Sequence, residues 1–188
     1  NRLIPLCFLR ILIYWYSNLH CKCKWNNSFS ADFSVNTGVK QGGVLSPQIF
    51  AVYVDDLVLE LKKSGLGCHI VDLFIAAVFY ADDLALCAPT RSSLQGLVDI
   101  CVSYGRKWCI EYNFKKTKIV VFGKNRDTSS FSDVFLDDKK VDYVDSWKYL
   151  GVTVVSSGRF QCSSSRELAS FYGAANTILN VLRKPSEV

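Results

Sequence analysis

The sequence predicts an α+β fold, with helices and strands mixed along the chain and no regular strand–helix–strand alternation. Four segments space their apolar residues three and four apart, as helices do, and several others are short runs rich in β-branched and aromatic residues bounded by turn residues. With 188 residues, of which 49% are apolar and 13% aromatic, the composition is that of a packed globular protein. This length allows one domain with a sizeable core or two small ones.

The N-terminal part of the chain is predicted to hold a helix and a pair of strands. Residues 3–16 form an apolar run interrupted by Arg10, and we interpret them as a buried amphipathic helix. The run is too short to span a bilayer, and no small-residue cleavage signal accompanies it. Residues 21–25 and 30–35 follow as two strands joined at Asn26-Asn27.

Residues 38–47 form a glycine-dense loop that leads into the second helix. Gly42 and Gly43 let the backbone approach a ligand closely and Lys40 supplies a positive charge, although most glycine-rich loops are plain turns. Ser46 suits the helix N-cap and Pro47 suits the first helical position. The apolar face of this helix consists of Phe50, Tyr53, Val54, Leu57, Val58 and Leu61.

The middle of the chain predicts a hairpin of two buried strands. Residues 70–80 form a nearly continuous apolar run, which is typical of a strand covered on both faces, and residues 84–88 form the next strand. Asp82 and Asp83 therefore occupy the tight connection between the two strands.

The remaining elements follow from the same signals. Thr90 caps a third helix that runs to Trp108, and residues 113–118 form a basic turn before a strand at 119–122. The rest of the chain predicts a hairpin over residues 134–144, a strand over 147–154 and a final helix over 163–184.

Two adjacent aspartates in apolar surroundings are the strongest chemical signal in the chain. Asp82 and Asp83 repel each other and lose hydration among buried strands, and a divalent cation such as Mg²⁺ would neutralise both. Aspartate pairs without a metal are common, and Asp55-Asp56 lies in nearly the same local sequence. Helical spacing puts that second pair on the polar side of its helix, as a solvated face. The sequence thus selects Asp82 and Asp83 as candidate metal ligands.

Charge and cysteine content limit the class of protein. The net charge of +5 permits nucleic-acid binding without demanding it. The eight cysteines lack the paired spacing of a zinc site, and most fall in apolar segments, so we interpret them as reduced core residues of an intracellular protein. The chain has no methionine, even at position 1, and we expect it to be a fragment of a longer protein.

Four motifs, taken in order, resemble those of a reverse transcriptase, and the similarity is greatest to LINE-type, non-LTR retrotransposon enzymes. They are GVKQGGVLSP at residues 38–47, YADD at 80–83, NFKKTK at 113–118 and YLGV at 149–152. Each motif alone is weak or moderate, whereas their shared order and spacing are specific. The resemblance extends over residues 12–154 and more loosely over the last helix.

The resemblance implies the palm of a right-hand polymerase, with part of the fingers and the start of the thumb, incomplete at the N-terminus. Residues 1–48 would be partial fingers and the entry to the palm, 49–155 the palm with the catalytic hairpin, and 156–188 the start of a thumb-like helical region. The implied activity is RNA-directed DNA polymerisation by two-metal nucleotidyl transfer. The implied partners are an RNA template, a DNA primer and deoxynucleoside triphosphates, with no membrane.

The resemblance also implies roles for individual residues. Asp82 and Asp83 would be catalytic and hold two Mg²⁺ ions, and Lys116 would lie near the nucleotide phosphates, where it could donate a proton to the leaving pyrophosphate. Contacts to the template and the incoming nucleotide would come from Lys40, Gln41, Gly42 and Tyr80, and the primer would be gripped by Leu150 and Gly151.

One part of the implied metal site has no counterpart in the chain. The family uses a third aspartate on a strand before the glycine-dense loop, and the only acidic residue before position 38 is Asp32, whose segment resembles a different strand. We therefore expect two of the three carboxylates, no activity of the chain by itself, and an open strand edge beside the hairpin. Two other interpretations stay open: a catalytically dead or domesticated nucleic-acid-binding relic, and an RNA-dependent RNA polymerase.

Overall fold

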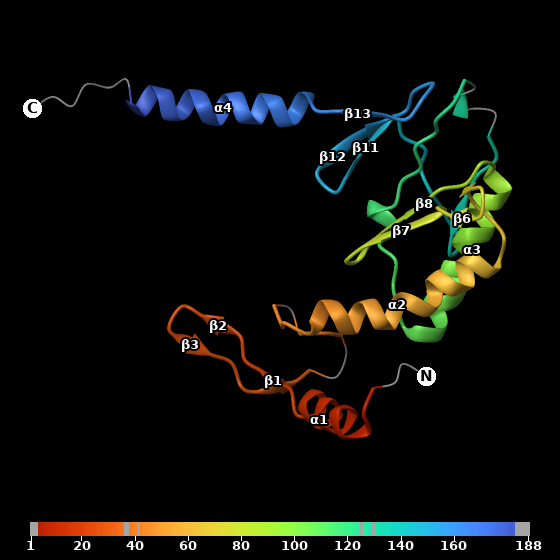
Figure 1. Ribbon diagram of the computed structural model, residues 1–188. Helices are drawn as coiled ribbons and strands as arrows, with labels where there is room; N and C mark the ends of the chain where they lie inside the picture. Colours follow the sequence, from red (N-terminus) through yellow and green to blue (C-terminus); the bar gives the residue numbers. More distant parts are fainter. Residues whose placement is uncertain (1–3, 36–37, 41, 125, 129–130, 183–188) are drawn as a thin grey trace, which may run out of the picture. The chain divides into compact units, whose positions relative to one another are not determined.

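The computed structural model describes residues 4–35, 38–40, 42–124, 126–128 and 131–182. They form a mixed α+β fold with α-helices and small antiparallel sheets (Figure 1). The chain divides into two compact units, Asn1–Asp55 and Asp56–Val188. The predicted fold class is therefore confirmed at the level of α+β.

The first unit begins with helix α1 and a two-part hairpin. Helix α1 spans Leu6–Ser17, and the hairpin consists of β1 (His20–Cys21), β2 (Lys24–Trp25), β3 (Ser28–Phe29) and β4 (Phe33–Ser34). Strand β2 pairs with β3, and β1 pairs with β4. The reversal falls at Asn26-Asn27 as predicted, with Asn26 at a φ of +52°. The predicted burial of α1 is wrong, because none of its described side chains is buried.

Helix α2 spans Ser46–Lys63, as the sequence predicts. The Ser46 hydroxyl donates to the main-chain oxygen of Lys40, at 2.6 Å. Val54, Leu57 and Leu61 are the buried apolar positions of α2, and the neighbouring pair Asp55-Asp56 is exposed. Asp55-Asp56 lies on a helix and Asp82-Asp83 at a hairpin, so these two aspartate pairs differ in secondary structure, as the difference in periodicity indicated.

The core of the second unit forms between α2 and helix α3, which spans Arg91–Trp108. Thr90 caps α3 by accepting a hydrogen bond from the main-chain N–H of Ser93, as predicted. At the other end Cys109 adopts a left-handed conformation that closes the helix. The buried cluster consists of Leu57, Leu61, Ala76, Leu97, Cys101 and Tyr104.

The predicted strand over residues 70–80 is broken in two. Strands β5 (His69–Ile70) and β6 (Leu73–Phe74) form their own hairpin, and only β7 (Ala77–Tyr80) continues toward the aspartates. Val71 makes the extra turn with a φ of +54°, a conformation that a β-branched residue rarely adopts and that apolar periodicity cannot reveal. The predicted burial on both faces is also wrong, because β7 alternates between half-buried and exposed residues.

Strand β7 pairs with β8 (Asp83–Leu86) in an antiparallel ladder of two strands. Within the described part of the chain no third strand joins this ladder. The strands of the first unit pair only with one another among these residues.

The C-terminal third contains more turns than the sequence predicts. Residues 147–154 are a hairpin and not a single strand: β11 (Ser146–Tyr149) turns at Leu150-Gly151 into β12 (Val152–Val155), and β13 (Gln161–Ser163) adds to the same sheet. The predicted strand at 119–122 reduces to an isolated parallel bridge between Ile119 and Tyr143. The last helix, α4, spans Ser165–Leu182.

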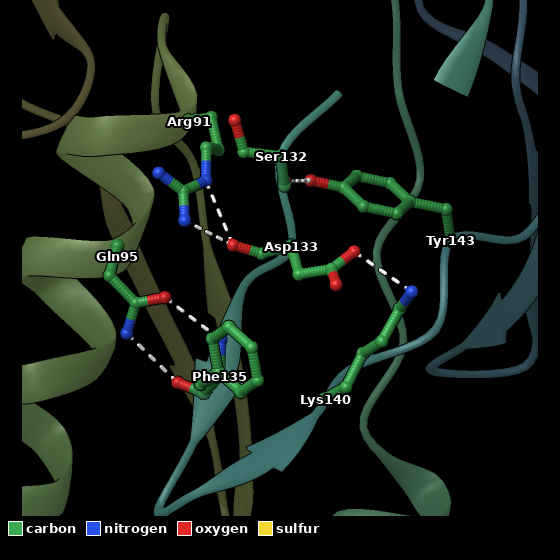
Figure 2. A network of polar contacts seen from close by, with 7 residues as sticks. All are labelled: Arg91, Gln95, Ser132, Asp133, Phe135, Lys140 and Tyr143. Atoms are coloured by element: carbon green, nitrogen blue, oxygen red, sulfur yellow. Dashed lines mark hydrogen bonds and ion pairs between the residues drawn. The ribbon is translucent and has the colours of Figure 1, made fainter. Parts of the chain in front are cut away.

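A polar network attaches the predicted 134–144 hairpin to helix α3. The hairpin forms as β9 (Phe135–Leu136) and β10 (Lys139–Lys140). The Gln95 amide both donates to the main-chain oxygen of Phe135, at 2.9 Å, and accepts from its N–H, at 2.8 Å, as a neighbouring strand would (Figure 2). One turn earlier on α3, Arg91 donates to the main-chain oxygen of Asp133. Helix side chains thus take the place of a strand along this edge.

Candidate metal and nucleic-acid site

The aspartate hairpin is a tight turn between two four-residue strands. Ala81 and Asp82 make the turn, and Tyr80 pairs with Asp83 across it. Ala81 has a φ of +51°, which is uncommon for a residue other than glycine. Asp82 and Asp83 therefore lie at a hairpin tip, as the sequence predicts.

The environment of these two carboxylates differs from the expected one. Both residues are exposed, so they are not desolvated among buried strands, and their predicted burial is wrong. Among the described residues no lysine, arginine or histidine forms an ion pair with either. Two adjacent hard oxygen donors without a cationic partner fit a divalent ion such as Mg²⁺. They do so only in part, since the described residues contain no cluster of three or more metal-binding side chains.

A second hairpin contacts the first. The Tyr149 hydroxyl, at the end of β11, donates to the main-chain oxygen of Val78 in β7, with 3.4 Å between the two oxygens. Burial, and then the negative charge of Asp83 and the nearby Cys87 thiol, raise the pKa of Tyr149. The contact joins the aspartate hairpin to the hairpin whose turn is Leu150-Gly151, so the structure brings together two of the predicted functional segments.

The basic turn at residues 113–118 folds into a short 3₁₀ helix, Phe114–Lys116, capped by the Asn113 side chain. Its lysines have different surroundings. Lys118 pairs with Asp142 at 2.6 Å, whereas Lys116 is exposed and has no ion pair within the described ranges. No hydrogen bond or ion pair links Lys116 to Asp82 or Asp83 in that part of the chain.

The glycine-dense loop belongs to the first unit. Lys40 and Gly42 border a cavity of about 280 Å³, while Gln41 lies outside the described residues. Gly42 has a φ of +77°, which explains the need for glycine there. The cavity is lined by Trp15, Tyr16, Leu19, Lys40 and residues 42–46.

Sequence reasoning missed Tyr149 as a residue that contacts the aspartate hairpin. Its motif was noted for Leu150 and Gly151, and the contact depends on a partner 71 positions away. In the sequence, the alternation of aromatic Trp147 and Tyr149 with charged Lys148 offers a weak signal that the ring faces inward.

The fold and the site agree with the sequence comparisons. A family model described as "Reverse transcriptase (RNA-dependent DNA polymerase)" matches residues 6–154. The chain belongs to the reverse transcriptase family. The match spans all four motifs and both contacting hairpins except the end of β12, so the resemblance inferred from the motifs is confirmed.

Individual relatives of this chain come from non-LTR retrotransposons. The chain is 30% identical over 146 residues, 74% of its length, to the retrovirus-related Pol polyprotein from type-2 retrotransposable element R2DM of Drosophila melanogaster. From the same organism, the RNA-directed DNA polymerase from mobile element jockey is 29% identical over 64% of the chain. The probable RNA-directed DNA polymerase from transposon BS is 25% identical over 82% of the chain. The chain spans only 14%, 13% and 17% of the lengths of these three relatives.

Family membership has consequences for ligands. Reverse transcriptases act on nucleic acids and use divalent metal ions, which accords with the paired carboxylates at the hairpin tip.

All eight cysteines are free thiols, but only Cys101 is buried, so their interpretation as core residues is wrong. No described helix is long and apolar enough to cross a membrane.

Proposed function

We propose that the chain is a segment of an RNA-directed DNA polymerase from a non-LTR retrotransposon, and that it contributes to two-metal, template-directed nucleotidyl transfer. The observation that supports this most is the pair of carboxylates, Asp82 and Asp83, at a tight hairpin tip within the family match, with no ion pair to the residues that the structure describes. RNA template, DNA primer and deoxynucleoside triphosphates are the proposed partners.

The proposed mechanism divides the work among the hairpins and loops. Asp82 and Asp83 would hold Mg²⁺, which when bound activates the primer 3′-hydroxyl and stabilises the departing pyrophosphate. Lys116, exposed and without an ion pair in the described ranges, would neutralise nucleotide phosphate and donate a proton to pyrophosphate. Leu150 and Gly151 would grip the primer, and the contacts to template and nucleotide would come from Lys40, Gln41, Gly42 and Tyr80.

The proposed division into subdomains follows the family. Residues 1–48 would be partial fingers and palm entry, 49–155 the palm, and 156–188 the start of the thumb. Helix α4 supports the last assignment, since it is a single long helix with an exposed apolar face of the kind that packs on other parts of a larger protein.

Two carboxylates at one turn leave the octahedral coordination of Mg²⁺ incomplete. The remaining ligands would be water, substrate phosphates and a third carboxylate. Among the described residues, no third carboxylate lies in a cluster with Asp82 and Asp83. We propose that the chain alone holds the metal weakly and does not polymerise, and that activity requires the family's upstream strand with its aspartate.

The test compares two matched aspartate pairs. In the chain extended upstream to include that strand, Asp82→Asn and Asp83→Asn should each lower template-directed nucleotide incorporation by at least about 100-fold, because each removes a charge that holds metal at the reaction centre. The control substitutions Asp55→Asn and Asp56→Asn change the same residue type in exposed positions on α2 and should leave incorporation within about threefold of the parent, as surface substitutions usually do. Incorporation that survives Asp82→Asn and Asp83→Asn would show that the metal assignment is wrong.

The same assay separates the two other functions. A nucleic-acid-binding relic, which the net charge of +5 permits, would bind primer–template but incorporate nothing even in the extended protein. An RNA-dependent RNA polymerase would incorporate ribonucleotides in preference to deoxyribonucleotides.

A further inference from the structure

The hairpins β7–β8 and β11–β12 share one design. Each joins two four-residue strands through a two-residue turn, and each turn begins with a non-glycine residue at positive φ, Ala81 at +51° and Leu150 at +50°. Tyr149 is the last residue before the second turn, and its hydroxyl donates to Val78, which lies two residues before the Tyr80–Asp83 pair. One side chain therefore links the bases of both turns.

We propose that Tyr149 is a positioning residue, whose hydroxyl fixes the Leu150-Gly151 turn relative to the Asp82-Asp83 turn. The proposal rests on the proposed function, in which one turn holds the primer and the other holds the metal. Nucleotidyl transfer requires the reacting atoms to approach within about 3–3.5 Å, and a displacement of about 1 Å can cost roughly 100-fold in rate. Loss of a link between the two turns should therefore lower the reaction rate more than it lowers the stability of the fold.

The chemistry of the contact supports positioning over packing. The ring of Tyr149 is half-buried and would pack equally well as phenylalanine, so the hydroxyl adds only the directed bond to Val78. At 3.4 Å the bond is longer than the usual hydroxyl–oxygen distance, and its contribution to folding should be small.

The chain itself offers a matched control. The Tyr143 hydroxyl donates to the main-chain oxygen of Ser132, at 3.1 Å, so Tyr143→Phe removes the same type of bond in the same unit (Figure 2). That bond joins neither turn. If loss of a tyrosine–carbonyl bond acted only through stability, the two substitutions would have similar effects.

The experiment uses Mn²⁺ as a paramagnetic probe with the 188-residue chain. Bound at Asp82 and Asp83, Mn²⁺ broadens the amide NMR signals of residues 80–84 and, with the steep distance dependence of the effect, those of residues 149–152. In Tyr149→Phe the broadening at Leu150 and Gly151 should fall by roughly twofold or more, as expected when a site is no longer held to within about 0.5 Å. The broadening at residues 80–84 should stay unchanged, and Tyr143→Phe should change neither set.

Each outcome decides between the two proposals. Unchanged broadening at Leu150 and Gly151 in Tyr149→Phe, with normal broadening at residues 80–84, overturns the positioning role and leaves the proposed function intact. No selective broadening at residues 80–84 in the parent chain overturns the metal site and the positioning role together. Should Tyr149→Phe fail to fold, 4-aminophenylalanine at position 149 restores a donor, and the positioning role requires it to restore the parent pattern as well.

Discussion

Single residues with positive φ form the turns of this protein, and only some of these turns can be predicted from the residue type. Asn26, Asp137, Asp138 and Gly151 are residue types that tolerate positive φ, so turns at these places are predictable. Val71, Ala81 and Leu150 also have positive φ but belong to types that avoid it. The strand over residues 70–80 was predicted as continuous because nothing about Val71 as an isolated residue indicates a turn.

A buried thiol makes stability depend on alkaline pH. Burial raises the pKa of Cys101 from its usual 9.0 to about 12, and burial likewise raises the pKa of Tyr112 beside it. Between about pH 9 and 12 the thiol of the unfolded chain ionises while the folded one keeps its proton, so the free energy of unfolding falls as pH rises. The contribution of Cys101 is at most about 1.4 kcal/mol per pH unit. Below pH 9 both states are protonated and the effect vanishes.

Urea unfolding between pH 8 and 11 measures this slope. Cys101→Ala should lower stability at every pH, because it leaves a small cavity, but should show a shallower decline above pH 9. A decline as steep as that of the parent chain would contradict the assignment of the slope to Cys101.

At the scale of elements, helices are predicted well because their signals are local. Residues within about four positions of each site predict the Thr90 cap, the apolar faces of α2 and α3, and the helix α4. The hairpins are harder to predict, because a two-residue turn inside an apolar run does not interrupt the two-residue period of the strands. Residues 147–154 were predicted as one strand for this reason, even though Gly151 marks the turn.

The contact between α3 and β9 yields a prediction about elements. Gln95→Ala removes two hydrogen bonds to the Phe135 backbone and should lower the free energy of unfolding by about 1–2 kcal/mol, with faster hydrogen exchange at the Phe135 amide. Gln48→Ala, a change of the same type at an exposed position on α2, should stay within about 0.5 kcal/mol. Equal effects of the two substitutions would show that the amide bonds contribute nothing.

At the scale of the whole molecule, the second unit depends on one buried cluster assembled from distant segments. Leu61 of α2 is fully buried among residues of β7 and α3 and the segment between them, while Leu59 on the same helix is 48% exposed. Leu61→Ala should therefore cost about 2–4 kcal/mol of unfolding free energy, and Leu59→Ala less than about 1 kcal/mol. Urea unfolding followed by far-UV circular dichroism measures both, and similar midpoints would contradict this core.

The sequence alone determined the α+β class, the helices, the choice of Asp82-Asp83 over Asp55-Asp56, and the family. These follow from short-range chemistry: periodicity, caps, turn residues and the order of motifs. Its argument for the metal site was partly wrong, because Asp82 and Asp83 lie exposed at a tip and are not buried. The tertiary structure decided their exposure, the turn at Val71 and the contact from Tyr149 to Val78. The contact joins residues 71 positions apart, while the turn and the exposure depend on backbone conformation and packing that the pattern of apolar residues does not encode.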